Sequence, residues 1–236
     1  MCLQCTALSR RRFVSIAASG VAAAGLWTVG SFSPSFAATT MSADQALEKI
    51  KAGNKKFLTV PDLCTVKINE NRSAIAKTQS PWATILTCAD SRVSPELVFG
   101  GVGLGEFFVC RNAGNVADTA VMGSIEYSIE HLGTPLVVVM GHSRCGGIQA
   151  ACDVVEKGTT LPGSIKGMVD AILPAAQAMK GKSGDYVDNV VRENARLNAL
   201  KIMNESQIVN EQVHGGKVKV VYAHYDLDTG KVDFLG

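Results

Sequence analysis

The stretch Trp82-Ala-Thr-Ile-Leu-Thr-Cys-Ala-Asp-Ser-Arg92 joins a mostly apolar run to a cluster of polar and reactive side chains. The first part, Trp82–Thr87, predicts a strand that is buried on both faces, because apolar residues stand at successive positions. The same arrangement returns farther along the chain, where the apolar run Leu136–Gly141 is followed by His142-Ser-Arg-Cys-Gly-Gly147. The two stretches predict neighbouring parallel strands, each ending in side chains that can do chemistry.

The side chains that follow the two runs form a donor set for a metal ion. Ligands bind beyond the carboxyl ends of the strands in an open parallel sheet, so we expect Cys88, His142 and Cys145 to converge at one edge. Thiolates and imidazole suit Zn²⁺, and three protein donors leave the fourth position open for water, as in catalytic zinc sites. The His-x-x-Cys spacing alone also fits a buried pair without metal. Its combination with Cys88 predicts a zinc centre.

Asp90 and Arg92 follow the first cysteine closely enough to act on the same centre. Our hypothesis is that Asp90 accepts the proton of the water on zinc while Arg92 holds it, and takes the fourth ligand position when released. Gly146 and Gly147 begin the helix after the second cluster. They permit close backbone approach, and their N–H groups at a helix N-terminus suit an anionic substrate.

Apolar runs alternate with helical periodicity through most of the chain, which predicts an α/β fold with a mostly parallel central sheet flanked by helices. The expected strands are Trp82–Thr87, Phe107–Cys110 and Leu136–Met140, the expected helices are Thr119–His131, Gly146–Val155, Ile165–Met179 and Val187–Val213, and Val218–Tyr225 with Lys231–Leu235 predict a closing hairpin. A capped helix is expected from Ser42 to Leu58, although Gly53-Asn54 interrupts its pattern. Residues 69–77 predict a short helix.

The first 38 residues predict an export signal, and residues 39–236 a single catalytic domain. Ser9-Arg-Arg-Arg-Phe13 resembles a twin-arginine signal, the weakly hydrophobic run Val14–Phe32 follows, and Ser35-Phe-Ala-Ala38 is a cleavage pattern. We expect cleavage near Ala37 and Ala38, a periplasmic location in a bacterium, and no stable membrane anchor afterwards. A retained N-terminal transmembrane anchor is the alternative, which the many glycines and alanines disfavour.

The charge of the chain excludes a nucleic-acid partner. The whole sequence carries a net charge of +2 with 23 basic and 21 acidic residues, and three of the basic residues lie in the predicted signal. The remainder is close to neutral and lacks the clustered lysines and arginines of a phosphate-binding surface. Five of the seven cysteines lie beyond the signal. This odd number argues against a disulfide framework.

Three segments resemble the β-class carbonic anhydrases: Cys88-Ala-Asp-Ser-Arg92, Arg111-Asn-Ala-Gly-Asn115 and Gly141-His-Ser-Arg-Cys-Gly-Gly147. The resemblance runs from about Ser42 to the C-terminus. It implies one Zn²⁺ per subunit and the reversible hydration of CO₂ to bicarbonate and a proton by zinc-bound hydroxide. It also implies a homodimer or higher homo-oligomer, with the site near the subunit interface.

The resemblance extends to the plant-like subtype of that family. Gln79, Phe108 and Tyr127 match the residues that position substrate and form an apolar pocket wall in this subtype, and Ile85 stands where the other subtype carries a tryptophan. The match implies a site open to water, with Asp90 off the zinc. The remaining histidines, His131, His214 and His224, are expected to be surface or structural residues.

Two other functions remain open on these residues. The same scaffold and zinc ion can hydrolyse another linear heterocumulene, CS₂ or COS, because the walls of a site decide its substrate. A non-catalytic zinc protein or a thiol-redox protein of the cell envelope is the second alternative, and the redox version requires Cys88 and Cys145 to be close together and free of metal. Neither version gives Asp90, Arg92 or Gln79 a role.

Overall fold

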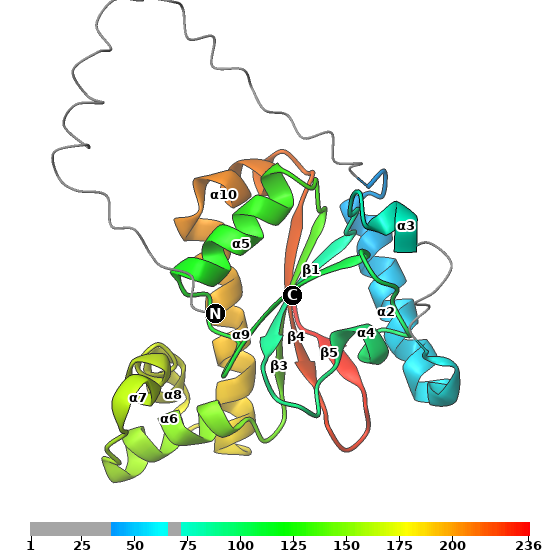
Figure 1. Cartoon of the computed structure of the whole chain (residues 1–236). Coiled ribbons are helices and arrows are strands. Elements are labelled where there is room, and N and C mark those ends of the chain that lie inside the picture. The colour runs from blue at the N-terminus through cyan, green and yellow to red at the C-terminus, as the bar shows by residue number, and fades with distance from the viewer. Residues whose placement is uncertain (1–38, 66–71) are drawn as a thin grey trace, which may run out of the picture. The chain divides into compact units, whose positions relative to one another are not determined.

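Within the residues that the computed structural model describes, 39–65 and 72–236, a sheet of five strands runs in the order β2-β1-β3-β4-β5 (Figure 1). The strands are β1 Ala83–Cys88, β2 Phe107–Asn112, β3 Leu136–His142, β4 Lys219–Tyr225 and β5 Val232–Phe234. β1 pairs in parallel with β2 and β3, β3 pairs in parallel with β4, and β5 is antiparallel to β4. The predicted α/β fold with a mostly parallel sheet and a closing hairpin is confirmed.

Helices cover both faces of the sheet (Figure 1). They are α2 Ala43–Thr59, α3 Arg72–Ile75, α4 Pro95–Val98, α5 Thr119–Glu130, α6 Gly146–Lys157, α7 Gly163–Asp170, α8 Leu173–Met179, α9 Tyr186–Glu205 and α10 Gln207–His214, with a short 3₁₀ helix at Pro61–Leu63. In the figure α2 and α4 lie on one side of the sheet and α5, α9 and α10 on the other. α6 and α8 pack against α9 beyond the strand ends.

Every residue of β1 and β3 is buried, which explains their continuous apolar runs. Side chains alternate between the faces of a strand, so the two central strands supply both halves of the core. Ile85 and Val138 belong to the cluster that α2 and α4 cover, whereas Leu86 and Val139 belong to the cluster that α5 and α9 cover. The two central strands are therefore enclosed between the two layers of helices.

The capped helix expected from Ser42 to Leu58 is confirmed as α2, which continues through Gly53 and Asn54 although they interrupt the apolar pattern. Ser42 caps the helix with a capping box. Gly53 lies so close to Phe99 that a Cβ atom there would be 2.1 Å from its carbonyl oxygen. Asn54 is buried, and its side-chain amide donates a hydrogen bond of 3.0 Å to the carbonyl oxygen of Gly230. Gly53 thus permits the close approach of Phe99, and the buried Asn54 bonds α2 to the turn before β5.

Two predicted long helices are each divided in two. The expected helix Ile165–Met179 breaks between α7 and α8, where Pro174 lies in the first turn of α8. Proline lacks an N–H group and clashes with the preceding turn, so it cannot continue a helix. The expected helix Val187–Val213 breaks at Ser206, which is extended and caps α10. The Ser206 hydroxyl also donates a hydrogen bond of 2.6 Å to Glu126 on α5.

The strands reach farther than expected at their carboxyl ends. Cys88 and His142 are the last residues of β1 and β3, not residues that follow them. The predicted export signal, residues 1–38, and the start of the short helix expected over residues 69–77 lie outside the described residues. Among the helices of the described part, none has the length and hydrophobicity needed to cross a membrane.

Candidate metal centre

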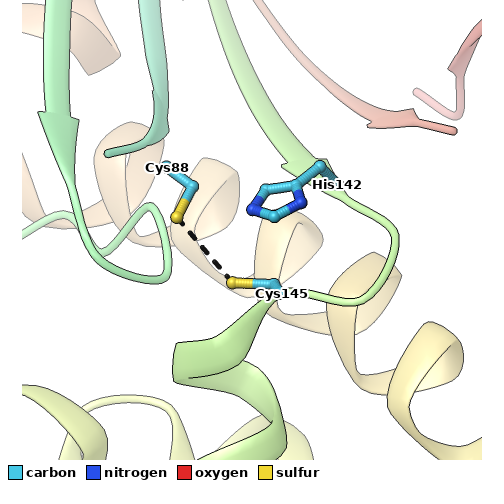
Figure 2. A group of neighbouring side chains, drawn as sticks. All are labelled: Cys88, His142 and Cys145. Atoms are coloured by element: carbon cyan, nitrogen blue, oxygen red, sulfur yellow. Dashed lines mark hydrogen bonds between the residues drawn. The ribbon is translucent and has the colours of Figure 1, made fainter. Parts of the chain in front are cut away.

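The fold brings Cys88, His142 and Cys145 together at the carboxyl edge of the sheet (Figure 2). Cys88 ends β1, His142 ends the neighbouring strand β3, and Cys145 is the residue before the first turn of α6. One potential donor atom from each side chain lies within 4.8 Å of the other two, and all three residues are buried. The sequence-predicted ligands therefore form one group that can hold a metal ion.

The geometry of this group fits zinc. The sulfur atoms of Cys88 and Cys145 are 3.8 Å apart, and two thiolates that bind one tetrahedral zinc ion at about 2.3 Å each lie about 3.8 Å apart. His142 Nδ1 lies 2.9 Å from the carbonyl oxygen of Ser143, which can only accept, so Nδ1 carries the proton. The lone pair is then on Nε2, which is buried and has no hydrogen-bond partner. A buried nitrogen of this kind needs a ligand.

The two thiols differ in acidity. A hydrogen bond from the Cys145 thiol lowers the pKa of Cys88 to about 4, with a smaller contribution from the backbone N–H of Gly114 and against the opposing effect of burial. The pKa of Cys145 is raised because it donates to an ionised Cys88 and is buried. Cys88 therefore ionises readily, and Cys145 requires the positive charge of a metal ion to do so.

Asp90 is held beside the group by Arg92. The guanidinium donates from Nε to Asp90 Oδ1 at 2.9 Å and from its terminal nitrogen to Oδ2 at 2.7 Å, and the backbone N–H of Arg92 adds a third bond. These hydrogen bonds hold the pKa of Asp90 well below its usual range. Asp90 Oδ2 lies 3.8 Å from His142 Nε2. An ionised carboxylate is therefore fixed next to the atom that would bind the metal.

Arg111 on β2 orders the segment that follows Cys88, a role that the sequence did not reveal. Its Nε donates to the carbonyl oxygen of Cys88 at 2.9 Å, and its terminal nitrogen donates to the carbonyl oxygen of Asp90 at 2.7 Å. The sequence pointed to Arg111 only because Arg111–Asn115 is one of the three segments that resemble the β-class carbonic anhydrases. Arg111 thus fixes the backbone that carries both a ligand and the carboxylate.

A glycine loop after β2 completes the surroundings of Cys88. The N–H of Gly114 donates to the sulfur of Cys88 at 3.5 Å, and its carbonyl oxygen accepts a bond of 2.8 Å from Asn194 on α9. A Cβ atom on Gly147 would lie 3.4 Å from the nitrogen of Gly114, whereas one on Gly146 would meet nothing within 4 Å. The start of α6 at Gly147 therefore lies in van der Waals range of this loop, and Gly146 borders open space.

Replacing Gly114 with alanine is expected to destabilise the fold next to the metal centre. Gly114 has a φ of +79°, and an added Cβ would lie 2.6 Å from Ile172 Cδ1. Gly181 has a φ of +75° with nothing within 4 Å, so Gly181→Ala is a matched control for backbone strain alone. We expect Gly114→Ala to lower the free energy of unfolding by about 1–3 kcal/mol more than the control, measured by urea denaturation. Equal losses in the two variants would contradict this.

Gln79, Phe108 and Tyr127 lie apart from the metal group within one chain. Gln79 precedes β1 and lines a cavity of 320 Å³ between α3 and the segment that leads into β2. Phe108 pairs in register with Thr84, whereas Cys88 pairs with the residue four positions farther along β2, a separation of about 13 Å along a strand. Tyr127 on α5 packs near Phe108 with ring centroids 6.2 Å apart. Their role in substrate binding stays a prediction.

The three other histidines differ in burial. His131 and His214 are exposed. His224 is buried on β4, where its Nε2 lies 2.6 Å from Asp188 and its Nδ1 accepts from the Arg192 guanidinium at 3.1 Å. Burial lowers the pKa of His224. This contact joins β4 to α9, which is a structural role.

Comparison with known proteins identifies the fold and the motifs. A family model described as carbonic anhydrase matches residues 83–232. Carbonic anhydrase 2 of Mycobacterium tuberculosis (strain CDC 1551 / Oshkosh) is 34% identical over 186 residues, which cover 79% of this chain and 89% of the relative. The carbonic anhydrase of Mycolicibacterium smegmatis is 31% identical over 188 residues, covering 80% and 91%. The solved structure of a Coccomyxa β-carbonic anhydrase in complex with acetazolamide has a TM-score of 0.62 at 30% identity, over 70% of this chain and 76% of that chain.

The region matched by the family model spans the whole sheet from β1 to the start of β5. It contains the three clustered donors together with Asp90, Arg92 and Arg111. The similarity therefore covers the elements that build the metal centre as well as the fold around it. The chain belongs to the β-class carbonic anhydrase family.

Proposed function

We propose that this chain catalyses the reversible hydration of CO₂ to bicarbonate and a proton with one zinc ion held by Cys88, His142 and Cys145. The observation that carries the proposal is the buried donor group, with sulfur atoms 3.8 Å apart and an unpartnered Nε2 on His142. Bound zinc supplies a water that is acidic enough to act as a nucleophile near neutral pH. Three protein donors leave room for that water.

Asp90 is the proposed proton acceptor, and Arg92 the residue that orients it. Both carboxylate oxygens of Asp90 are engaged by the Arg92 guanidinium, which supports a site of the open subtype with Asp90 off the metal. The low pKa of Asp90 keeps it ionised at neutral pH, so it can accept a hydrogen bond from the reacting water but does not keep the proton. The proton released in each turnover then passes to solvent.

We infer that the chain acts as a homodimer or a higher homo-oligomer, in which a second subunit brings Gln79, Phe108 and Tyr127 to the site. Within one chain these residues lie far from the metal group, so they can serve it only from a neighbouring copy. β2 is an edge strand of the sheet, and edge strands are places where chains pair. Leu104 and Tyr127 near this edge are 50% and 39% exposed. Gly146 and Gly147 stay the proposed backbone contacts for bicarbonate.

Stopped-flow measurement of CO₂ hydration from pH 6.5 to 9 tests this function on zinc-loaded protein that starts at Ala38. We expect fast turnover across the range, because Asp90 is bound to Arg92 and leaves the metal open. Activity that appears only at high pH would show that Asp90 occupies the metal, which contradicts the open subtype. Zinc-loaded protein without hydration at any pH would favour CS₂ or COS hydrolysis, or a non-catalytic metal site.

We propose that residues 1–38 direct export to the periplasm through a twin-arginine route. The support is the sequence Ser9–Phe13 followed by a weakly hydrophobic run and a cleavage pattern at Ser35–Ala38. Residues 1–45 fused to a reporter that functions only after export in a folded state are expected to give signal. Replacing Arg10, Arg11 and Arg12 with lysine should abolish it. Retention of the unchanged fusion in the cytoplasm would overturn the assignment.

A further inference from the structure

The turn between β4 and β5, residues 226–231, lies against the ligand loop, residues 142–145. The backbone N–H of Ser143 donates to the carbonyl oxygen of Tyr225 at 2.9 Å. The Ser143 hydroxyl accepts from the N–H of Leu227 at 2.9 Å. The carbonyl oxygen of Ser143 accepts from His142 Nδ1. Ser143 is thus bonded to the turn on one side and to a ligand on the other.

Arg144 has an unusual backbone conformation inside the ligand loop. Its φ is +54°, in the left-handed region that residues with a side chain rarely adopt. It lies between His142 and Cys145, so its conformation decides how the chain returns Cys145 to the metal group. A strained residue at this point persists only if its surroundings hold it.

Asp228 in the turn holds Arg144 from outside. Two hydrogen bonds, 2.6 and 2.9 Å long, join the two terminal nitrogens of the Arg144 guanidinium to the two carboxylate oxygens of Asp228. The side chains are 57% and 67% exposed, and an isolated exposed pair of this kind contributes little to stability. The bidentate geometry does fix the orientation of the Arg144 side chain relative to Asp228, because the guanidinium and the carboxylate are both planar.

The turn that presents Asp228 is itself anchored. Asp226 Oδ1 accepts from the N–H groups of Asp228 at 2.8 Å and Thr229 at 2.9 Å. Asn54 of α2, which is buried, donates to Gly230 and accepts from the N–H of the first residue of β5 at 2.9 Å. Asp228 therefore projects from a segment that is tied to the core on the α2 side of the sheet.

We propose that Asp228 is a positioning residue for the metal centre: through Arg144 it holds the left-handed turn that spaces His142 and Cys145, and so retains zinc. The inference rests on the zinc centre of the proposed function. Ligand side chains that already lie in the right places lose little conformational freedom when the ion binds. Residues that hold these ligands in place can therefore raise the affinity for the ion without contacting it. Asp228 touches neither ligand directly, and its effect passes entirely through Arg144 and the backbone.

The test measures the rate of zinc transfer from the zinc-loaded full-length chain to a chromogenic chelator, together with the melting temperature of the metal-free form. Asp228→Ala and Arg144→Ala are each expected to speed zinc release about tenfold or more. Arg144→Gly should speed it less, because glycine adopts a positive φ without strain. Asp228→Ala should add nothing to Arg144→Ala, since both remove the same interaction.

Asp153→Ala is the matched control, because it breaks an exposed ion pair of 2.8 Å with Lys157 on α6 that does not contact the ligand loop. Its zinc release should equal that of the unchanged chain. Unchanged release in Asp228→Ala, or additive effects in the double variant, would overturn the inference while the zinc centre stands. Failure of the unchanged chain to bind zinc would overturn both. The test does not measure CO₂ hydration. It therefore establishes the role of Asp228 even if the zinc-loaded protein is inactive.

Discussion

Cys145→Ser is expected to strip the protein of zinc and to abolish CO₂ hydration. A serine hydroxyl does not ionise near neutral pH and is a poor zinc donor, so only Cys88 and His142 would remain. Removing a residue that only supports a metal ligand lowers the metal affinity about 10- to 100-fold. Removing a ligand itself should therefore lower the zinc affinity by more than about 100-fold. Elemental analysis after dialysis measures zinc per chain, and stopped flow measures the hydration rate.

Cys152→Ser is the matched control on the same helix. Cys152 is buried on α6, and burial raises its pKa to about 11, so it is an inert thiol. This variant should lose some stability, because a hydroxyl replaces a buried sulfur, but should keep its zinc and its hydration rate. If Cys145→Ser retains both zinc and normal turnover, the group at the sheet edge is not the catalytic centre.

The metal group could be predicted from the sequence because its geometry follows from topology. Cys88 and His142 each end a buried apolar run, and parallel strands place their carboxyl ends at one edge. The loop that carries Cys145 begins at His142 and is short, so the third donor has little freedom in where it can lie. Asp90 and Arg92 are separated by a single residue, and their pairing is a local contact.

Contacts between distant segments could not be predicted in this way. Asn194 reaches Gly114 from a helix far along the chain, and Asp228 meets Arg144 from the last hairpin. The helix break at Ser206 was missed because the apolar periodicity continues across it, whereas in the structure Ser206 caps α10 and donates a hydrogen bond to Glu126 of α5. The periodicity of a sequence predicts which face of a helix or strand is buried. It does not predict which residues of two distant elements meet, because that depends on how the elements pack.

Asp90→Asn is expected to leave zinc bound and to lower turnover severely. The amide oxygen of the substituted side chain can still accept a hydrogen bond from Arg92, but the amide cannot take a proton from the water that reacts with CO₂. General bases contribute about 10²- to 10⁴-fold to rates, so a fall of about 100-fold or more is expected. Asp90 is not among the three donors, so zinc per chain, measured by elemental analysis, should not change.

The pH profile separates this role from a structural one. The pKa of Asp90 is lowered, so Asp90 is ionised from pH 6.5 to 9, and any stability it confers is present there and is lost only in acid. Asp90→Asn should therefore lower the rate by a similar factor at each pH. Glu193→Gln is the control, because Glu193 also accepts two bonds from an arginine, Arg196, but lies outside the metal group. Near-normal turnover in Asp90→Asn, with zinc bound, would show that the proton leaves by a route in which the carboxylate takes no part.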